Sequence, residues 1–181
     1  MDSHLQRLKQ ELEDATWGAS DNDLLQAPEG KWNSAQILEH LLLTYKGTNQ
    51  GIARCLKKNA PLATRATLKH RFATLLAVNL GYMGGGRKAP QLAVPRNMPP
   101  EEVRHGIAPE LQRMAEGLEE CDRRFGAGTK LMDHPILGPL TVDEWRKLHW
   151  LHGRHHARQI RERIGKARDR RPAHAGRLFW K

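Results

Sequence analysis

The sequence predicts an all-α fold, a four-helix bundle, from three observations. Four long segments carry apolar residues three or four positions apart with charged residues between them. Three of these segments begin with residue combinations that are typical of helix starts. We see no convincing strand alternation and no internal repeat. Because 181 residues are enough for one well-packed domain, we expect a single bundle over residues 1–165, followed by a basic tail at 166–181.

The first predicted helix covers residues 2–17 and ends before Gly18. Its apolar face consists of Leu5, Leu8, Leu12 and Ala15. A polar connection containing Pro28 and Gly30 follows. The second predicted helix begins at Asn33, which can cap it, with Gln36 in the capping-box position, and it runs to about Lys57.

The middle of the chain is less regular. Residues 62–80 have a helical pattern, but the segment 83–100 contains three consecutive glycines and four prolines and has no periodicity. We expect it to be a long crossover loop that crosses the bundle end or covers a pocket. It is not a Walker phosphate loop, because Lys88 is followed by Ala89 instead of a hydroxyl residue.

Two further helices complete the predicted bundle. One opens at Pro100 with acidic residues in its first turn and ends near Gly126. The last one begins after Pro139, where Thr141 and Glu144 form a capping box, and it continues to about Gly165.

The net charge of +10 is concentrated at the C-terminus. Residues 157–181 contain nine Lys/Arg and two Asp/Glu, whereas residues 1–156 contain 21 and 18. Motifs that read bases and interleaved aromatic residues are missing, so nucleic-acid binding is not the favoured interpretation of the tail.

Composition also indicates the compartment. Cys55 and Cys121 are far apart and lack metal or redox spacing, which favours a reducing environment. The N-terminus has charged residues where a secretory signal needs an apolar run, and apolar stretches are too short to span a membrane. We expect a cytoplasmic protein that does not associate with membranes.

Histidines are the most informative residues. Five of the ten lie between positions 134 and 156. At about 100° per residue, one narrow stripe of the last helix carries His149, His152 and His156 together with Trp145 and Gln159, bracketed by aliphatic residues. The stripe should therefore face the interior of the bundle, where each ring nitrogen needs a partner.

A metal ion can be such a partner. His152 and His156 are four residues apart and project side by side, as in HExxH sites, but no glutamate follows His152, so the protease motif is excluded. His40 on the second helix is the best third ligand, because its own face is polar or small and leaves room. That face carries Asn33, Gln36, Thr44, Gly47 and Gly51. Three histidines with an open position would suit catalysis, and Gln159 could bond to His156. Hydrogen-bonded core histidines or exposed ones remain the alternative.

Three segments resemble the DinB-like (DinB/YfiT-like) superfamily. They are HPILGPLT at residues 134–141, HGRHHARQI at 152–160 after Trp145, and WNSAQILEHL at 32–41. The resemblance covers about residues 5–165. It implies an up-down-down-up four-helix bundle and places His40, His152 and His156 at the metal-binding positions of that superfamily. His134 also matches a position of the pattern, as a pocket or capping residue, whereas His149 is additional and could pack on Trp145.

The resemblance implies a divalent-metal-dependent thiol transferase or hydrolase acting on a small molecule, with zinc or nickel favoured as the metal. It further implies a low-molecular-weight thiol as co-substrate, and a homodimer. No residue can be assigned as a catalytic acid or base. The alternatives are a non-catalytic metal-binding module and a nucleic-acid-interacting bundle that uses the tail.

Overall fold

The computed structural model describes residues 3–79, 81 and 89–169 and is mostly helical. The α-helices are α1 (Ser3–Thr16), α2 (Asp21–Leu25), α3 (Ser34–Lys58), α4 (Leu68–Thr74), α5 (Pro100–Phe125) and α6 (Val142–Asp169). Two short irregular helices are η1 (Leu75–Asn79) and η2 (Gln91–Ala93), and the strands are β1 (Lys130–His134) and β2 (Gly138–Thr141).

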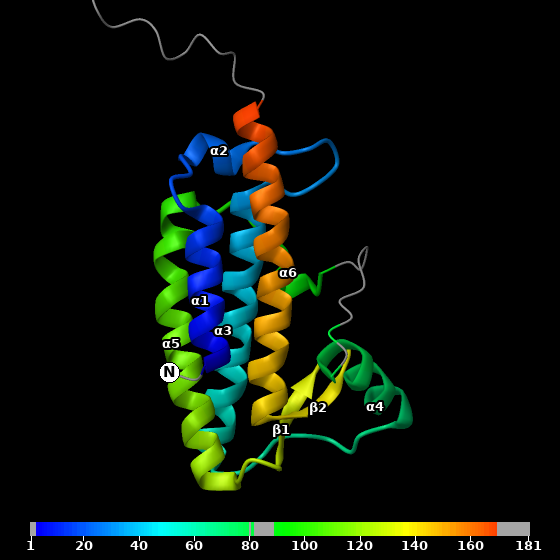
Figure 1. Ribbon diagram of the computed structural model, residues 1–181. Coiled ribbons are helices and arrows are strands. Elements are labelled where there is room, and N and C mark those ends of the chain that lie inside the picture. Colours follow the sequence, from blue (N-terminus) through cyan, green and yellow to red (C-terminus); the bar gives the residue numbers. More distant parts are fainter. Residues whose placement is uncertain (1–2, 80, 82–88, 170–181) are drawn as a thin grey trace, which may run out of the picture.

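The four long helices, α1, α3, α5 and α6, lie side by side (Figure 1). In this view the chain runs upward in α1 and α6 and downward in α3 and α5. The short α2 lies at the upper end, whereas α4 and the two strands lie beside the lower end. α3 packs along α5, and α1 packs along α6. The second and the last predicted helices, α3 and α6, also contact each other.

The helix starts follow the local sequence. Asn33 and Gln36 form the predicted capping box at the start of α3, and Thr141 and Glu144 form the one at the start of α6. Because each pair satisfies two backbone N–H groups that have no partner inside the helix, these starts are specified locally.

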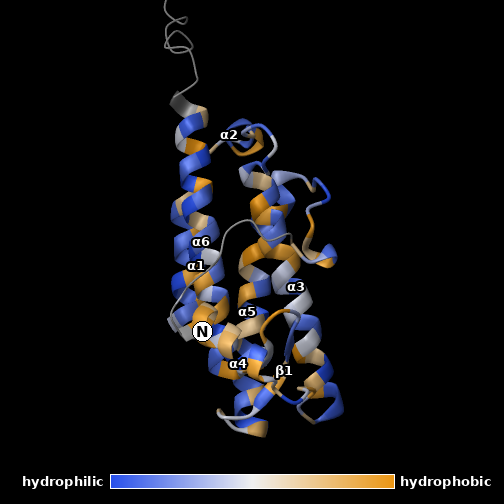
Figure 2. Cartoon of the chain, turned by 90° about the vertical axis from the view of Figure 1, so that its right-hand side faces the viewer, coloured by the Kyte–Doolittle hydropathy of each residue, from blue (hydrophilic) through white to orange (hydrophobic). Residues whose placement is uncertain are grey.

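Amphipathic faces build the core. Hydrophobic and hydrophilic residues alternate around each long helix (Figure 2), and the apolar residues of α1 predicted to face inward, including Leu5 and Leu8, are fully buried. Gly153 lets α1 approach α6 closely, since a Cβ at this position would collide with the side chain of Leu8. The glycine between His152 and Arg154 therefore serves helix packing.

The antiparallel hairpin of β1 and β2 was not predicted. Its strands are only five and four residues long, and Gly138, with φ of 69°, stands where the second strand begins. Leu131 and Leu140 are buried, which ties the hairpin to the bundle core. Burial against the helices stabilises the two strands, whose sequences show no clear alternation of apolar and polar residues.

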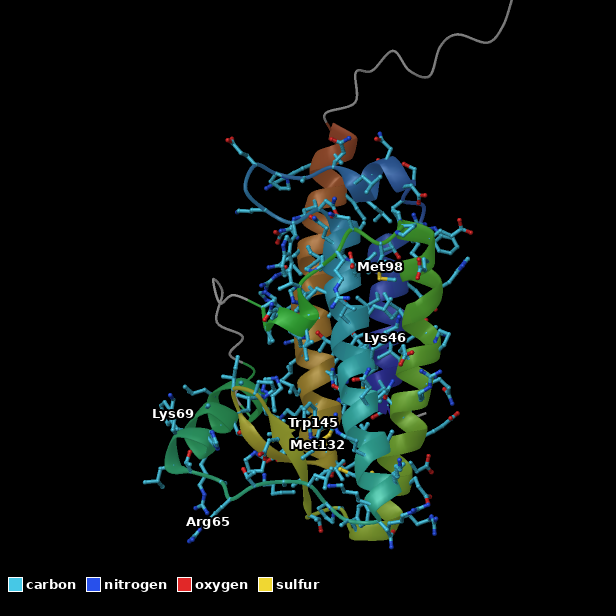
Figure 3. All side chains as sticks on the ribbon, turned by 180° about the vertical axis from the view of Figure 1, so that it is seen from behind. Lys46, Arg65, Lys69, Met98, Met132 and Trp145 are labelled. Carbon is cyan, nitrogen blue, oxygen red and sulfur yellow. The ribbon has the colours of Figure 1, made fainter. Side chains whose placement is uncertain are left out.

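The segment predicted as a helix over 62–80 is shorter than expected. Residues 61–67 are not helical, and helical structure begins at Leu68 after Thr67, whose hydroxyl caps the helix by accepting from the His70 N–H. The helix then widens into a π-helix at Leu75–Asn79. Lys69 and Arg65 project away from the bundle (Figure 3).

Three other expectations can be compared with the structure. In the described part of the chain, no helix is long and apolar enough to cross a membrane. Both cysteines are buried and free. α6 continues to Asp169, so the first four residues of the predicted tail are helical; the rest of the tail, 170–181, and residues 83–88 of the predicted loop lie outside the described residues.

Candidate metal centre

α3 and α6 bring the three predicted histidines together. The Nε2 atom of His152 lies 3.4 Å from Nε2 of His40 and 3.1 Å from Nε2 of His156. One nitrogen from each of the three rings lies within 4.8 Å of the others. The rings of His40 and His156 meet edge to face, with their centroids 5.1 Å apart. The structure therefore places all three candidate ligands around one point.

The opposite ring nitrogens of two histidines are fixed by hydrogen bonds. Nδ1 of His40 donates to the carbonyl oxygen of Ala93 at 2.8 Å, and Nδ1 of His156 donates to Oε1 of Gln159 at 2.9 Å. The Gln159 amide nitrogen in turn donates to His155 at 3.1 Å, which orients the amide. Since a neutral imidazole carries one proton, Nε2 of His40 and of His156 each present a lone pair to the cluster.

This arrangement leaves an excess of acceptors. The single proton of a neutral His152 ring can satisfy at most one of the two lone pairs that face its Nε2 atom. A cation with several open coordination positions would satisfy all three nitrogens. A tetrahedral zinc ion bound at the usual distance of about 2.0–2.1 Å holds its nitrogen ligands about 3.3–3.4 Å apart, close to the 3.4 and 3.1 Å that separate Nε2 of His152 from the Nε2 atoms of His40 and His156. The residues fit a metal ion.

Burial keeps the three imidazoles neutral. It lowers the pKa of His156 to about 3, with a further contribution from nearby His40. Burial also lowers the pKa of His152 well below its usual value, and the adjacent His156 and His40 add to this effect. The pKa of His40 is lowered by burial, against the opposing effect of its hydrogen bond to Ala93. Neutral rings at pH 7 are the form that binds metals.

The cluster lies at the edge of the core. His40 is only 5% exposed, whereas His152 and His156 are partly exposed. The expected space beside His40 is present only in part. A Cβ on Gly47 would meet nothing within 4 Å, but one on Gly51 would collide with the Met132 side chain from β1.

Sequence reasoning missed the residues that hold His40 in place. Glu39, which is 1% exposed, accepts hydrogen bonds from the backbone N–H groups of Arg96 and Met98 at 2.6 and 3.1 Å. It thereby fixes the segment that directly follows η2, whose last residue is Ala93. A glutamate at a core position of a helix is unusual, and this was the one signal in the sequence that could have indicated a structural role for Glu39.

The other histidines of the stripe have different surroundings. His149 is 1% exposed, lies 3.1 Å from Thr48 Oγ1 through Nε2, and stacks on Trp145 with ring centroids 5.8 Å apart. His134 accepts from the backbone N–H groups of Ile136 and Leu137, each at 3.2 Å, and so closes the hairpin turn. Neither ring belongs to the cluster of three.

A separate cavity of about 410 Å³ lies between α4 and the hairpin. Its lining includes His70, Thr74, Lys130 and Glu144, and none of the three clustered histidines. The histidine cluster and this cavity are therefore distinct features of the molecule.

The fold and the cluster together define a class: a mostly helical protein in which three histidines from two helices could hold a metal ion. The chain belongs to a family described as a protein of unknown function, DUF1569, whose model matches residues 8–163. That match includes all three clustered histidines. Comparisons with curated proteins and with solved structures found no match.

Proposed function

We propose that the protein is a divalent-metal-dependent enzyme of the DinB-like type, a thiol transferase or a hydrolase that acts on a small molecule. The observation that carries this proposal is the convergence of the three Nε2 atoms of His40, His152 and His156. Hydrogen bonds to Ala93 and Gln159 orient two of these rings before any ligand arrives. Such preorientation is typical of metal-binding histidines.

The arrangement of the helices supports the superfamily assignment. α1 and α6 run in one direction and α3 and α5 in the other (Figure 1), which is the up-down-down-up order that the resemblance implies. The three histidines lie on the second and the last of these long helices, also as the resemblance implies. The hairpin coincides with the HPILGPLT segment, where His134 closes the turn.

The set of three ligands supports a catalytic role for the metal site over a purely structural one. Three protein ligands leave a tetrahedral ion with one open position, and the partial exposure of His152 and His156 lets a small molecule reach it. When bound there, a divalent metal lowers the pKa of a coordinated water or thiol and polarises a substrate. The protein residues hold neutral nitrogens in place and keep the inner side of the cluster dry. Zinc and nickel both suit imidazole ligands.

The first test is metal content. Protein purified without a histidine tag is analysed by plasma mass spectrometry for the wild type, for His40→Ala, His152→Ala and His156→Ala, and for the control His105→Ala, an exposed histidine on α5. We expect about one transition metal per chain in the wild type and the control, and a loss in the three variants. A wild type that neither carries nor binds zinc or nickel would contradict the proposal.

The second test separates an enzyme from a non-catalytic metal protein. The metal-loaded wild type is screened with thiol acceptors and activated esters, and each hit is repeated with His152→Ala. Turnover that disappears with the metal supports the enzyme. A stoichiometric ion that no thiol, water analogue or chelator can reach would instead indicate a structural metal.

A further inference from the structure

Arg163 lies on the same stripe of α6 as the clustered histidines. Positions 152, 156, 159 and 163 follow one another at intervals of three and four residues and so share one face of the helix. Helical side chains tilt toward the N-terminus of their helix, which directs the long Arg163 side chain back toward His156. Its charge is close enough to contribute to the lowered pKa of His156.

The Arg163 guanidinium is incompletely paired. Its Nη1 atom is buried and has no hydrogen-bond partner among the described residues. Burial lowers the pKa of Arg163, and the charge of Glu162, the preceding residue, opposes this effect. Glu162 forms no hydrogen bond with Nη1 of Arg163. By contrast, Arg161 two positions earlier is paired with Glu11 of α1. A partly buried guanidinium with an unpaired N–H group is costly unless a ligand supplies an acceptor.

The charges around the cluster also favour an anionic ligand. The three candidate ligands are neutral imidazoles, so they would leave the full charge of a divalent ion uncompensated. Glu39, the nearest acidic residue in the sequence to His40, is occupied by the backbone N–H groups of Arg96 and Met98. Arg163 adds a further positive charge that is close enough to affect His156. An anionic small molecule would be attracted to this position on both counts.

The geometry points to a substrate-binding role for Arg163: its guanidinium binds a carboxylate, or a similar anionic group, of a small substrate whose reacting end lies at the three histidines. This inference rests on the proposed function, and it names the substrate class. A guanidinium is suited to the task because its planar fork matches a carboxylate with two parallel hydrogen bonds.

The test uses two thiols that differ only in charge, 3-mercaptopropionate and 3-mercaptopropionamide. Each is titrated calorimetrically into zinc-loaded wild type, Arg163→Met, Arg163→Lys and the control Arg158→Met, which removes an exposed arginine of the same helix. We expect the wild type and the control to bind the carboxylate about tenfold more tightly than the amide, as one charged hydrogen-bonded pair provides. Arg163→Met should lose this preference, and Arg163→Lys should keep only part of it.

A second readout does not depend on the metal. For metal-free protein in low salt, the midpoint of thermal unfolding should rise with millimolar 3-mercaptopropionate, and this rise should be absent with the amide and in Arg163→Met. If zinc fails to bind but this rise is seen, the anion site stands and the metal proposal fails. If Arg163→Met keeps the preference for the carboxylate, or the wild type shows none in either assay, the assignment of Arg163 is wrong.

Discussion

Two groups of histidines lie on one stripe of α6 and behave differently. His149 is buried, bonded to Thr48 and stacked on Trp145, so its surroundings come entirely from the protein. One and two turns further along, His152 and His156 are partly exposed, and their Nε2 atoms face each other and His40. The same residue type at the same helical spacing is a packed core residue in one turn and a candidate ligand in the next.

The difference lies in what α3 presents opposite each turn. Thr48 offers a hydroxyl oxygen to His149, and because that hydroxyl also donates to the Thr44 carbonyl, it accepts from the Nε2–H of His149. His40 instead presents an unprotonated nitrogen to His152. Complementary partners make a stable core contact, whereas facing lone pairs need a cation. The spacing along α6 determines which histidines share the stripe, and the residues that α3 places opposite them determine the role of each histidine.

The largest expected effect is on stability at His149. Replacing it with alanine in His149→Ala should lower the free energy of unfolding by about 3 kcal/mol, because a buried ring is lost and Thr48 loses its partner. Metal content should not change. Urea unfolding and metal analysis of the same sample measure both. A variant that loses the metal but keeps its stability would show that His149 belongs to the metal site.

The next effect is a pH dependence from the same residue. Burial lowers the pKa of His149 to about 3 in the folded protein, against 6.5 ordinarily. Between these values the unfolded chain binds a proton that the folded protein does not, so stability falls as the pH falls from about 6.5 toward 3. At a pH of about 4.5 the loss is about 2.7 kcal/mol.

Urea unfolding of metal-free protein at several pH values measures this loss. His149→Gln should reduce the proton uptake on unfolding by about one over this range, since a glutamine does not titrate. An unchanged slope in this variant would mean that His149 does not account for the dependence.

Adding metal should change the free energy of unfolding by a similar amount, and the change should depend on the clustered histidines and not on His149. Free zinc or nickel at about fifty times its dissociation constant should raise the free energy of unfolding of the wild type by about 2.3 kcal/mol. His149→Gln should gain as much, and His152→Ala should gain nothing. Thermal unfolding with and without metal measures the gain, and a chelator should reverse it. An equal gain in His152→Ala would place the binding elsewhere.

The smallest predicted effect concerns Gln159. Gln159→Leu keeps the size of the side chain but removes the acceptor for Nδ1 of His156, so that ring is free to rotate or change tautomer. Metal affinity should fall about tenfold, or about 1.4 kcal/mol. Competition with a chromophoric chelator measures it, and Gln112→Leu, at an exposed side chain of α5 that is bonded to Glu116, serves as the control. No change would mean that Ala93 and His40 alone order the cluster.

Much of the helical framework could be predicted from the sequence because it depends on local signals. The capping boxes at Asn33 and Thr141 and the proline at the start of α5 specify helix ends within one turn of the chain. The hairpin could not be predicted, since its short strands are stabilised by the burial of Leu131 and Leu140 against a bundle that forms from distant segments.

The candidate site shows the same division. Periodicity placed His149, His152 and His156 on one stripe, and the small and polar face of α3 favoured His40 as their partner. Periodicity could not place the Ala93 carbonyl or Glu39, because both act through a segment more than fifty residues away in the chain.

By itself, then, the sequence determined the four long helices and the stripe of histidines, since helix caps and apolar periodicity are properties of neighbouring residues. The tertiary structure alone decided that His149 meets a hydroxyl while His152 meets the lone pairs of His40 and His156, and that Nη1 of Arg163 has no hydrogen-bond partner among the described residues. These outcomes depend on how α3 and α6 align across more than a hundred residues, which no local pattern encodes.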